Sequence, residues 1–372
     1  MSKKILIFYI SKHSGHYHAA RAIEKAILQI DDSSSVELVN ALHYTNPILG
    51  AIINKAYLEV IKKKPELWGN IYDNPEVLKK TKKAREHLHR FNMSKIRRLI
   101  EKKGPDIVFC TQAFPCGMVA DYKRTSGSDL TLVGVLTDHA PHSYWIHEEV
   151  DYYAVPSEST ALKLEKKGVD REKVRACGIP VDPKFAECHK RENILKGLDL
   201  EPERPTILIM GGSQGLGAID KVVKSLLEDE KHDYQMLVVT GINKKLFRKL
   251  SRKGRKFREY VRVFPFVDNI DELMEASDMI ITKAGGITTA EALAKKLPIL
   301  IVEPIPGHER MNADYLVEAG AAVEIDDYYK MHERINRLFD SGKLAEMKKQ
   351  TKALSMPASA MDIAKFSLKA IR

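Results

Sequence analysis

The chain contains 372 residues, of which 44% are hydrophobic and 30% are charged, as in a soluble globular protein with room for two domains of ordinary size. No stretch reaches the roughly 18 uninterrupted apolar residues that a membrane-spanning helix needs, which excludes an integral helical membrane protein. The four cysteines show neither metal-binding spacing nor a CxxC pair and are predicted to be reduced thiols. An apolar strand directly after Met-Ser-Lys-Lys, with no cleavable signal, predicts a cytoplasmic protein.

The net charge of +10 is unevenly distributed along the sequence. Residues 45–104 contain 15 Lys and Arg residues against six Asp and Glu residues. A basic surface of this kind attracts anionic lipid or nucleic acid. A solvated helical face is the alternative interpretation of the same charges.

The first half of the chain alternates short apolar segments with helical ones. Residues 5–10 form a continuous apolar run, typical of a strand buried on both faces of a parallel sheet, and apolar residues then recur at helical spacing from Ala19 to Ile27. Further strands are predicted at residues 107–111, 131–137, 152–156 and 174–177. This alternation predicts a doubly wound parallel sheet.

Two turns in this half carry candidate catalytic side chains. His16 lies at a predicted helix N-terminus, where the helix dipole favours the neutral ring that a general base needs. Asp138 follows the strand at 131–137, at the carboxyl edge where ligands bind in open α/β sheets. Asp138 is either a rival base or the group that orients His16. The histidines after Asp138 fit no standard metal-ligand spacing, so no metal site is predicted.

The segment after residue 47 combines an apolar helical stripe with an aromatic residue and a basic cluster. This is the pattern of an interfacial membrane-binding helix, although the stripe also suits an ordinary core-facing helix. Nucleic-acid binding is disfavoured, because the aromatic residues are few and are not interleaved with the basic ones. The candidate membrane-contacting residues are Ile52, Ile53, Tyr57, Lys62, Lys63, Lys64 and Trp68.

The alternating pattern restarts in the second half. Residues 183–204 are rich in prolines and charges without periodicity, and are predicted to link an N-terminal domain of residues 1–182 to a C-terminal domain of residues 205–355. Residues 356–372 contain a predicted terminal helix. Strands of the second domain are predicted at residues 206–210, 235–240, 261–264, 279–282, 299–302 and 322–325.

A glycine-rich turn follows the first strand of the second domain. The run Gly211-Gly212-Ser213-Gln214-Gly215 lies between a strand and a helix, so its backbone N–H groups and one hydroxyl can face a phosphate. It is neither a Walker A loop nor a G-x-G-x-x-G fingerprint. Gly212 and Ser213 are the candidate diphosphate contacts, and a purely structural tight turn is the alternative.

A second phosphate-binding turn is predicted at residues 283–289. The pair Gly285-Gly286 lets backbone approach a ligand, and a helix beginning at about Ile287 offers N–H groups to an anion. Glu291 would repel phosphate but can accept two hydrogen bonds from a vicinal diol. Diphosphate beside ribose describes a nucleotide or a nucleotide-sugar. The candidate diphosphate residues here are Gly286, Ile287, Thr288 and Thr289.

These motifs resemble the donor site of glycosyltransferases with the two-domain GT-B fold. The nearest match is the branch that holds monogalactosyldiacylglycerol synthases, processive diacylglycerol glucosyltransferases and the N-acetylglucosaminyltransferase that forms lipid II. The Gly-Gly pair, Glu291 and the Pro-Gly-His-Glu of residues 306–309 fall in register with that family. The resemblance covers essentially the whole chain. It implies two Rossmann-like domains, an active site in the cleft between them, and a C-terminal helix that crosses back to the N-terminal domain.

The resemblance also implies roles for individual residues. Glu291 would bind the uridine ribose, His16 would be the base or a key acceptor contact, and residues 137–145 would line the acceptor side, with His142 and Trp145 among them. Inverting enzymes of this fold need neither a cofactor nor a catalytic metal. His308 departs from the Gln-Glu that diacylglycerol enzymes more often carry, which leaves the sugar open. The residues implied to contact the sugar are His308, Glu309 and Asn312.

The sequence therefore predicts an inverting hexosyltransferase that moves a sugar from UDP-glucose or UDP-galactose to a lipid hydroxyl, with diacylglycerol the expected acceptor. It would act at the inner face of the cell membrane as a peripheral protein, without nucleic acid. The alternatives are a polyprenyl-linked acceptor, a UDP-sugar 2-epimerase of the same fold, and a regulatory protein that binds a nucleotide-sugar without turnover.

Overall fold

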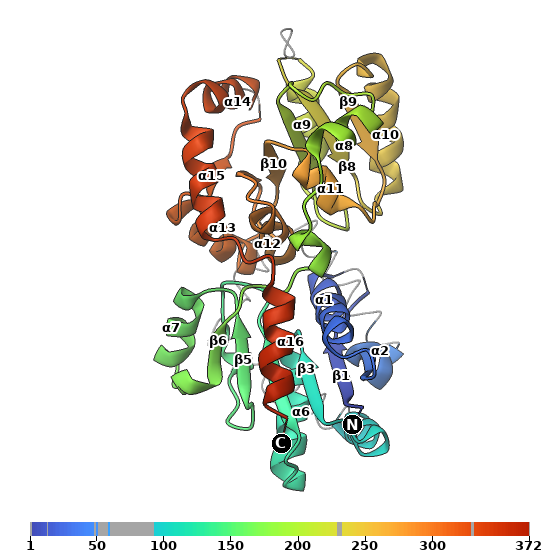
Figure 1. Ribbon diagram of the computed structural model, residues 1–372, viewed down its shortest axis with the longest axis vertical. Coiled ribbons are helices and arrows are strands. Elements are labelled where there is room, and N and C mark those ends of the chain that lie inside the picture. Colours follow the sequence, from blue (N-terminus) through green and yellow to red (C-terminus); the bar gives the residue numbers. More distant parts are fainter. Residues whose placement is uncertain are drawn as a thin grey trace. The chain divides into compact units, whose positions relative to one another are not determined.

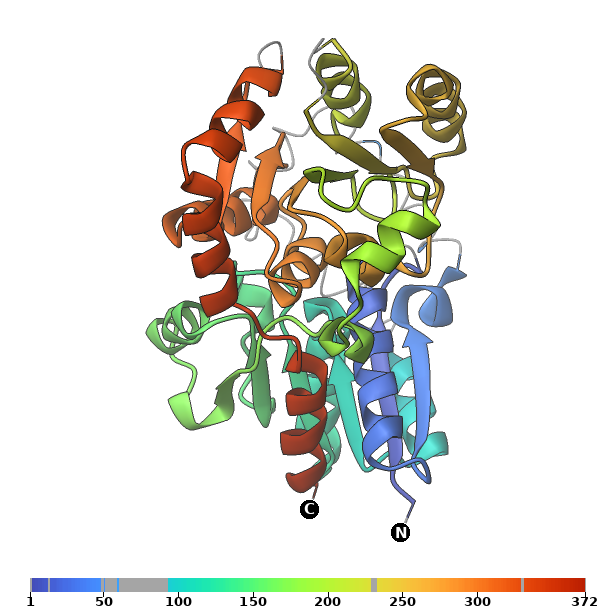
Figure 2. The same ribbon diagram turned by 45° about the horizontal axis from the view of Figure 1, so that its top comes forward.

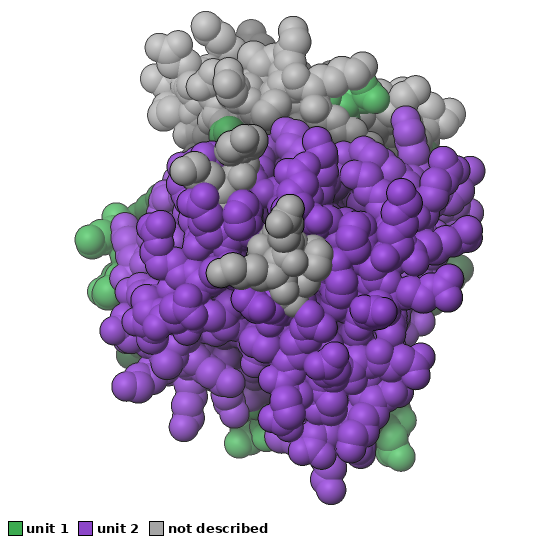
Figure 3. Space-filling model, turned by 90° about the horizontal axis from the view of Figure 1, so that it is seen from above, with its two compact units in different colours: residues 1–183, 305–308, 358–372 green, residues 184–304, 309–357 purple. Residues whose placement is uncertain are grey.

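The computed structural model describes residues 2–12, 14–47, 50, 59, 93–228, 233–328 and 331–371. The chain divides into two compact units, coloured separately in Figure 3. The N-terminal unit comprises Met1–Pro183, Ile305–His308 and Ala358–Arg372, and the C-terminal unit comprises Lys184–Pro304 and Glu309–Pro357. Both chain ends belong to the N-terminal unit (Figure 2). Among the described residues, no helix has the length and apolar character that crossing a bilayer requires.

The N-terminal unit is built on one parallel sheet of six strands in the order β2-β1-β3-β4-β5-β6. Its strands are β1 (Lys4–Tyr9), β2 (Ser35–Asn40), β3 (Ile107–Cys110), β4 (Thr131–Val135), β5 (Tyr152–Val155) and β6 (Val174–Ala176). Its helices are α1 (Gly15–Ile30), α2 (Ala41–Thr45), α6 (Ala113–Ser126), η1 (Ser143–Trp145), α7 (Glu158–Lys166), η2 (Arg171–Lys173) and α16 (Ser359–Lys369). The short helix η3 (Pro183–Ala186) begins where this unit ends.

The C-terminal unit repeats the plan, with a parallel sheet in the order β12-β11-β10-β7-β8-β9. Its strands are β7 (Thr206–Met210), β8 (Gln235–Val239), β9 (Val261–Phe264), β10 (Met279–Thr282), β11 (Ile299–Val302) and β12 (Ala322–Ile325). Its helices are α8 (Arg191–Gly197), α9 (Ile219–Leu226), α10 (Lys244–Gly254), η4 (Arg255–Phe257), α11 (Ile270–Glu275), α12 (Gly286–Ala294), α13 (His308–Glu318), α14 (Met331–Asp340) and α15 (Lys343–Ala353).

The expected fold class, two doubly wound parallel sheets, is confirmed. Every residue of the inner strands β3, β4, β7, β8, β10 and β11 is buried, as continuous apolar runs require when helices cover both faces of a sheet. In each unit the strand order reverses beside the first strand, next to β3 in one sheet and next to β10 in the other. Ligands of doubly wound sheets bind at such reversal points, outside the carboxyl ends of the strands.

The last helix of the chain completes the N-terminal unit. α16 packs against α1, and both helices lie on the same side of the N-terminal sheet (Figure 1). Ala22, Ile23 and Ala26 of α1 share one apolar cluster with Ala360 and Ile363 of α16. The alanines are small, so the two helices can approach closely, and each helix buries its apolar stripe against the other.

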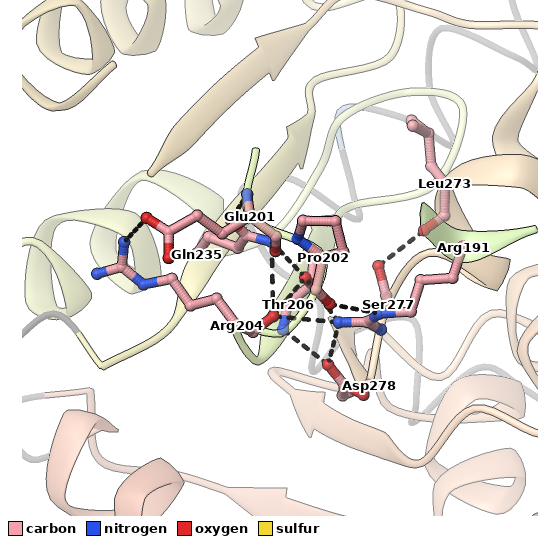
Figure 4. Close-up of polar contacts among 9 residues, drawn as sticks. All are labelled: Arg191, Glu201, Pro202, Arg204, Thr206, Gln235, Leu273, Ser277 and Asp278. Atoms are coloured by element: carbon pink, nitrogen blue, oxygen red, sulfur yellow. Dashed lines mark hydrogen bonds and ion pairs between the residues drawn. The ribbon is translucent and has the colours of Figure 1, made fainter. Parts of the chain in front are cut away.

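A polar cluster fastens the segment before β7 to the C-terminal sheet (Figure 4). Arg191 of α8 donates to the carboxylate of Asp278 at 2.9 Å and to the Thr206 hydroxyl at 3.1 Å. Gln235 is fully buried, and its Nε2 donates to the carbonyl of Glu201 at 2.8 Å and to Thr206 Oγ1 at 2.9 Å. Much of the predicted linker is therefore tied to the C-terminal unit by side chains from three separate segments.

We expect the Gln235→Leu variant to lower the free energy of unfolding by about 2–3 kcal/mol. Leucine has a similar volume, but it removes three hydrogen bonds: one from the Glu201 N–H, one to the Glu201 carbonyl and one to the buried Thr206 hydroxyl. Urea denaturation of the purified variant measures the effect. Glu203→Gln, an exposed change in the same segment, is the control and should shift stability by less than about 0.5 kcal/mol. Equal stability of Gln235→Leu and the unsubstituted protein would contradict this account.

Candidate functional site

The turn after β7 can be built only from glycine at two of its positions. A Cβ on Gly211 would lie 2.0 Å from the Leu216 carbonyl oxygen, and a Cβ on Gly215 would lie 2.0 Å from the Thr240 carbonyl oxygen. Gly212 and Gly215 also adopt positive φ angles of 67° and 59°. The turn folds tightly on itself and against the end of β8, so its backbone remains close to the carboxyl edge of the sheet.

This turn lies beside the turn that follows β10. A Cβ on Gly212 would be 3.8 Å from Thr288 Oγ1, so the two predicted phosphate turns lie within about one side-chain atom of each other at this point. β7 and β10 are neighbouring strands, with Ile281 paired to Ile209, which explains why their carboxyl ends meet. Gly212, Ser213 and the start of α12 therefore lie together at the reversal point of the C-terminal sheet.

The helix α12 begins one residue earlier than the sequence indicated. Gly285 is its N-cap, so the first three helical residues are Gly286, Ile287 and Thr288. The prediction that Thr289 offers a free amide is wrong, because its N–H donates to the Gly285 carbonyl at 3.0 Å as the first bond of the helix. Its buried hydroxyl donates to the same carbonyl at 3.0 Å. The anion-binding amides of this helix are thus those of residues 286–288.

Lys283 connects three elements of the predicted donor region. Its ammonium lies 2.7 Å from Glu309 Oε1, and both side chains are largely buried. Its aliphatic stem lies against Gly217, where an added Cβ would be 3.1 Å from Lys283 Cδ. The sequence analysis did not select Lys283, because nothing in the local pattern shows that it reaches α13 and the turn after β7 at once.

The predicted sugar contacts lie at the start of α13. His308 is half-buried and follows Gly307, which has a φ of 94°. Glu309 is 5% exposed and paired with Lys283. Asn312 is completely buried and donates to the Ala284 carbonyl at 3.0 Å, so it shapes the turn after β10 and does not face a ligand. The structure thus corrects the direct sugar contact expected of Asn312.

Glu291 lies on α12, five residues beyond Gly286, and is half-buried. Its position places a carboxylate further along the helix than the amides of residues 286–288. An anion and a diol of the same ligand can therefore be bound by different turns of one helix. This arrangement is what a nucleoside diphosphate requires.

In the N-terminal unit, His16 meets the turn that holds Asp138. His16 Nδ1 lies 3.2 Å from Thr137 Oγ1, and the Thr137 hydroxyl lies 3.4 Å from Asp138 Oδ2, to which it donates. Thr137 has a single hydroxyl proton. When that proton goes to the carboxylate, the hydroxyl can only accept from His16 Nδ1–H, which leaves the lone pair on Nε2. Thr137, which the sequence analysis passed over, is thus the link between the two candidate catalytic residues.

The electrostatic surroundings keep His16 neutral. Burial lowers the pKa of His16, and the nearby Asp138 carboxylate opposes this by favouring the charged ring. Burial is the larger effect, so the pKa of the imidazole is below its ordinary value. The backbone is also held, since the Thr111 hydroxyl donates to the His16 carbonyl at 2.9 Å. His16 is therefore a positioned imidazole in the form that accepts a proton.

The rest of the 137–145 turn is held by the protein interior. His139 is 5% exposed, and its Nδ1 lies 3.2 Å from the hydroxyl of Ser157, the N-cap of α7. Trp145 is 5% exposed within the apolar core, and its carbonyl accepts from the Tyr153 hydroxyl at 2.8 Å. The expectation that Trp145 faces an acceptor is therefore wrong. His142 is half-buried, with its ring centroid 6.2 Å from that of Trp145.

Part of the predicted membrane surface lies outside the described residues. This applies to Ile52, Ile53, Tyr57, Lys62, Lys63, Lys64 and Trp68. Within the described ranges, no group of three His, Cys, Asp or Glu side chains is arranged to hold a metal ion. The described residues thus provide helix N-terminal amides with a neighbouring carboxylate in the C-terminal unit, and an oriented imidazole in the N-terminal unit.

Comparison with known proteins gives two family matches that together span most of the chain. Residues 16–181 match the model of monogalactosyldiacylglycerol (MGDG) synthase, and residues 206–365 match the glycosyltransferase family 28 C-terminal domain. A processive diacylglycerol β-glucosyltransferase of Bacillus licheniformis is 30% identical over 361 residues, which cover 96% of this chain and 92% of the relative.

Solved structures resemble the whole chain at low sequence identity. MurG of Acinetobacter baumannii aligns with a TM-score of 0.62 and 13% identity, over 98% of this chain and 99% of that one. The UDP-GlcNAc 2-epimerase of Neisseria meningitidis, bound to UDP-GlcNAc, aligns with a TM-score of 0.62 and 15% identity, over 98% and 100% of the two chains. These two likenesses establish the fold. At 13% and 15% identity they do not indicate the reaction, for which the 30% identical relative is the better guide.

We expect the Asp138→Asn variant to lower the pKa of His16 further. The carboxylate is the main group that raises this pKa against burial, and an amide keeps the shape of Asp138 without its charge. NMR titration of the His16 ring in the full-length protein measures the change. Asp32→Asn, an exposed change near the other end of α1, should leave the titration unaltered. An unchanged or higher His16 pKa in Asp138→Asn would show that the two groups do not interact.

We expect His139 to make the fold sensitive to acid. Burial, aided by the Lys163 ammonium, lowers the pKa of His139 from 6.5 to about 3. Between these pH values the unfolded chain carries a proton at this residue that the folded chain does not, so the free energy of unfolding falls as the pH falls. The slope contributed by this residue is at most about 1.4 kcal/mol per pH unit.

Removing that histidine tests this contribution. His139→Gln should lose less stability than the unsubstituted protein on acidification from about pH 6.5 to about pH 4, even if it is less stable at neutral pH. Urea denaturation at several pH values measures both slopes. Parallel slopes would mean that His139 takes up its proton in the folded state as readily as in the unfolded state.

Proposed function

We propose that this chain, which belongs to the family of the processive diacylglycerol β-glucosyltransferases, transfers glucose from UDP-glucose to the free hydroxyl of diacylglycerol. The observation that carries the proposal is the 30% identity to such an enzyme across 96% of this chain and 92% of the relative. Because the likeness extends through both units, it includes the regions of His16 and of the two glycine-rich turns.

In this proposal the C-terminal unit binds the donor. The amides of Gly286, Ile287 and Thr288 and the turn at Gly212 and Ser213 receive the diphosphate. Two features support this assignment: the close approach of the two turns and their position at the strand-order reversal. Glu291 accepts from the ribose hydroxyls, and His308 and Glu309 lie at the start of α13, where the hexose would be bound.

Lys283 adds a function that the family motifs did not suggest. An ammonium paired with Glu309 at 2.7 Å holds that carboxylate in one orientation. Lys283 directly follows β10 and precedes the turn proposed to receive the diphosphate. A cation at this position offsets the charge of a bound diphosphate and of the carboxylate together.

In this proposal the reaction is a displacement at the anomeric carbon of glucose. His16 accepts the proton from the diacylglycerol hydroxyl as its oxygen bonds to that carbon, and the bond from the carbon to the UDP oxygen breaks with its electron pair. UDP leaves as an anion, which the turn amides stabilise without rearranging. Attack on the face opposite the leaving group inverts the configuration, so an α-linked donor gives a β-glucoside. Catalysis requires the acceptor at His16 and the donor at α12 to come together.

The location of the acceptor determines where in the cell the enzyme would act. Diacylglycerol resides in the membrane, so we propose that the protein acts as a peripheral enzyme at the cytoplasmic leaflet, reached through the apolar and basic residues of the 48–68 segment. Glucose is proposed over galactose because the full-length relatives are named glucosyltransferases.

The test is to incubate the purified protein with diacylglycerol and, separately, UDP-glucose, UDP-galactose or UDP-GlcNAc, and to identify lipids by mass spectrometry and the anomer by NMR. β-Glucosyldiacylglycerol from UDP-glucose is expected. A His16→Ala control should lower kcat by roughly 10²–10⁴. A galactolipid would correct the sugar, and conversion of UDP-GlcNAc without lipid would replace the proposal by an epimerase. Binding of UDP-sugars without any product would indicate a regulator.

We expect Glu291→Ala to raise the apparent KM for UDP-glucose by about 10–100-fold, because hydrogen bonds to a carboxylate are each worth about 1.5–3 kcal/mol. Steady-state kinetics with saturating diacylglycerol measure the change, and vesicle binding should be unaltered. Glu346→Ala on α15, an exposed residue of the same unit, is the control. An unchanged KM would remove Glu291 from the ribose site.

A further inference from the structure

The C-terminal unit carries a second strongly basic segment. Residues 244–258, which comprise α10, η4 and Arg258, contain nine Lys and Arg residues and no Asp or Glu residue. This charge density is higher than in the 45–104 segment that the sequence analysis selected. α10 lies at the β8–β9 end of the C-terminal sheet and packs against the edge strand β9 (Figure 1).

The basic residues share one side of the helix. Lys244, Arg248 and Arg252 follow one another at intervals of four residues, which places them in one row along an α-helix. The opposite side faces the protein, where Leu250 and Gly254 are buried. The exposed Lys and Arg residues of α10 and η4, here called the basic face, are Lys244, Lys245, Arg248, Lys249, Arg252, Arg255 and Lys256.

The charges of the basic face are almost uncompensated. Among the residues that the structure describes, one ion pair involves this face, between Lys249 and Asp220 of α9 at 2.7 Å. Like charges four residues apart destabilise a helix by a few tenths of a kcal/mol per pair. This repulsion is present on α10. On α15 of the same unit, by contrast, Glu346 pairs with Lys343 at 3.2 Å. An anionic partner would offset the repulsion.

We propose that the basic face of α10 binds the anionic headgroups of the membrane and gives the C-terminal unit a membrane contact of its own. A helix of 11 residues is about 16 Å long, so it can lie flat across several headgroups. Each Lys or Arg near an anionic leaflet strengthens binding roughly fivefold. α10 is already folded against β9, so binding carries no cost of ordering the helix.

A lipid surface fits these residues better than nucleic acid does. The two aromatic residues of the segment, Phe247 and Phe257, are half-buried, and Phe257 packs against the core of the C-terminal unit. The basic face therefore lacks the exposed rings on which single-stranded bases stack. The partner choice also rests on the proposed function, since a lipid acceptor brings the protein to a membrane.

The position of α10 connects this surface with the predicted donor turn. Its N-cap, Asn243, donates from Nδ2 to the Gly215 carbonyl at 3.2 Å, and the Ile242 N–H donates to the Ser213 carbonyl at 2.9 Å. The helix is thus attached at its N-terminus to the turn proposed to receive the diphosphate. A contact made by α10 is therefore made next to the donor site of the same unit.

The test compares two variants of the full chain that each lose four positive charges from the C-terminal unit. One changes Arg248, Arg252, Arg255 and Lys256 to Gln, and the other, the control on α15, changes Lys343, Lys348, Lys349 and Lys352 to Gln. Sedimentation is measured with vesicles of phosphatidylcholine alone and with added phosphatidylglycerol. We expect the α10 variant to lose at least about tenfold in affinity for the anionic vesicles, and the α15 control to lose little.

The outcomes separate this proposal from its rivals. Equal loss in both variants would attribute binding to net charge, and no loss in either would leave α10 without a membrane role; both overturn the proposal. So would a duplex or single-strand gel shift that the α10 variant abolishes while vesicle binding persists. Glucosyl transfer to diacylglycerol in neutral detergent micelles should be the same in the α10 variant and the unsubstituted protein. Absence of that activity in all three proteins would overturn the proposed function. The vesicle sedimentation would still decide whether α10 binds anionic membranes.

Discussion

The architecture depends on one constraint, which is that parallel strands end at the same edge of their sheet. In the C-terminal unit this brings the turns after β7 and β10 close together, because these strands are neighbours although some 70 residues separate them. At such a reversal point the connecting helices lie on opposite faces of the sheet, so the backbone amides of the two turns lie in the crevice between them. Glycine at 211 and 215 allows the turn after β7 to pack closely at this edge, where we propose that backbone N–H groups receive the diphosphate.

The same constraint acts differently in the N-terminal unit. There the carboxyl ends of β1, β3 and β4 bring together side chains instead of amides, namely His16, Thr111 and Thr137. Two hydroxyl groups position His16: the Thr111 hydroxyl donates to its backbone carbonyl, and the Thr137 hydroxyl contacts its ring Nδ1. Burial lowers the pKa of the His16 ring, and the Asp138 carboxylate partly opposes this shift. If His16 is the base, as we propose, its basicity depends on long-range packing as much as on its residue type.

Much of this could be predicted from the sequence, and the reason is local. Apolar runs of four to six residues identified the strands, and the glycines identified the tight turns at the carboxyl edge of the C-terminal sheet, because both signals are contained within a few residues. Lys283 and Thr137 could not be found in this way, since each acts on a residue far away in the chain. Thr289 was misjudged because the N-cap lies at Gly285, and Trp145 because an aromatic residue in a turn can face the core.

The packing of α16 has a consequence for how the protein is made. The helix α16 supplies Ala360, Ile363, Ala364 and Leu368 to the apolar cluster beneath α1, so the N-terminal unit lacks part of its interior until residues 359–369 leave the ribosome. The C-terminal unit, closed by Pro357, has its whole sequence available earlier. During vectorial synthesis the usual order is therefore reversed, and the half that is translated first is the half that matures last.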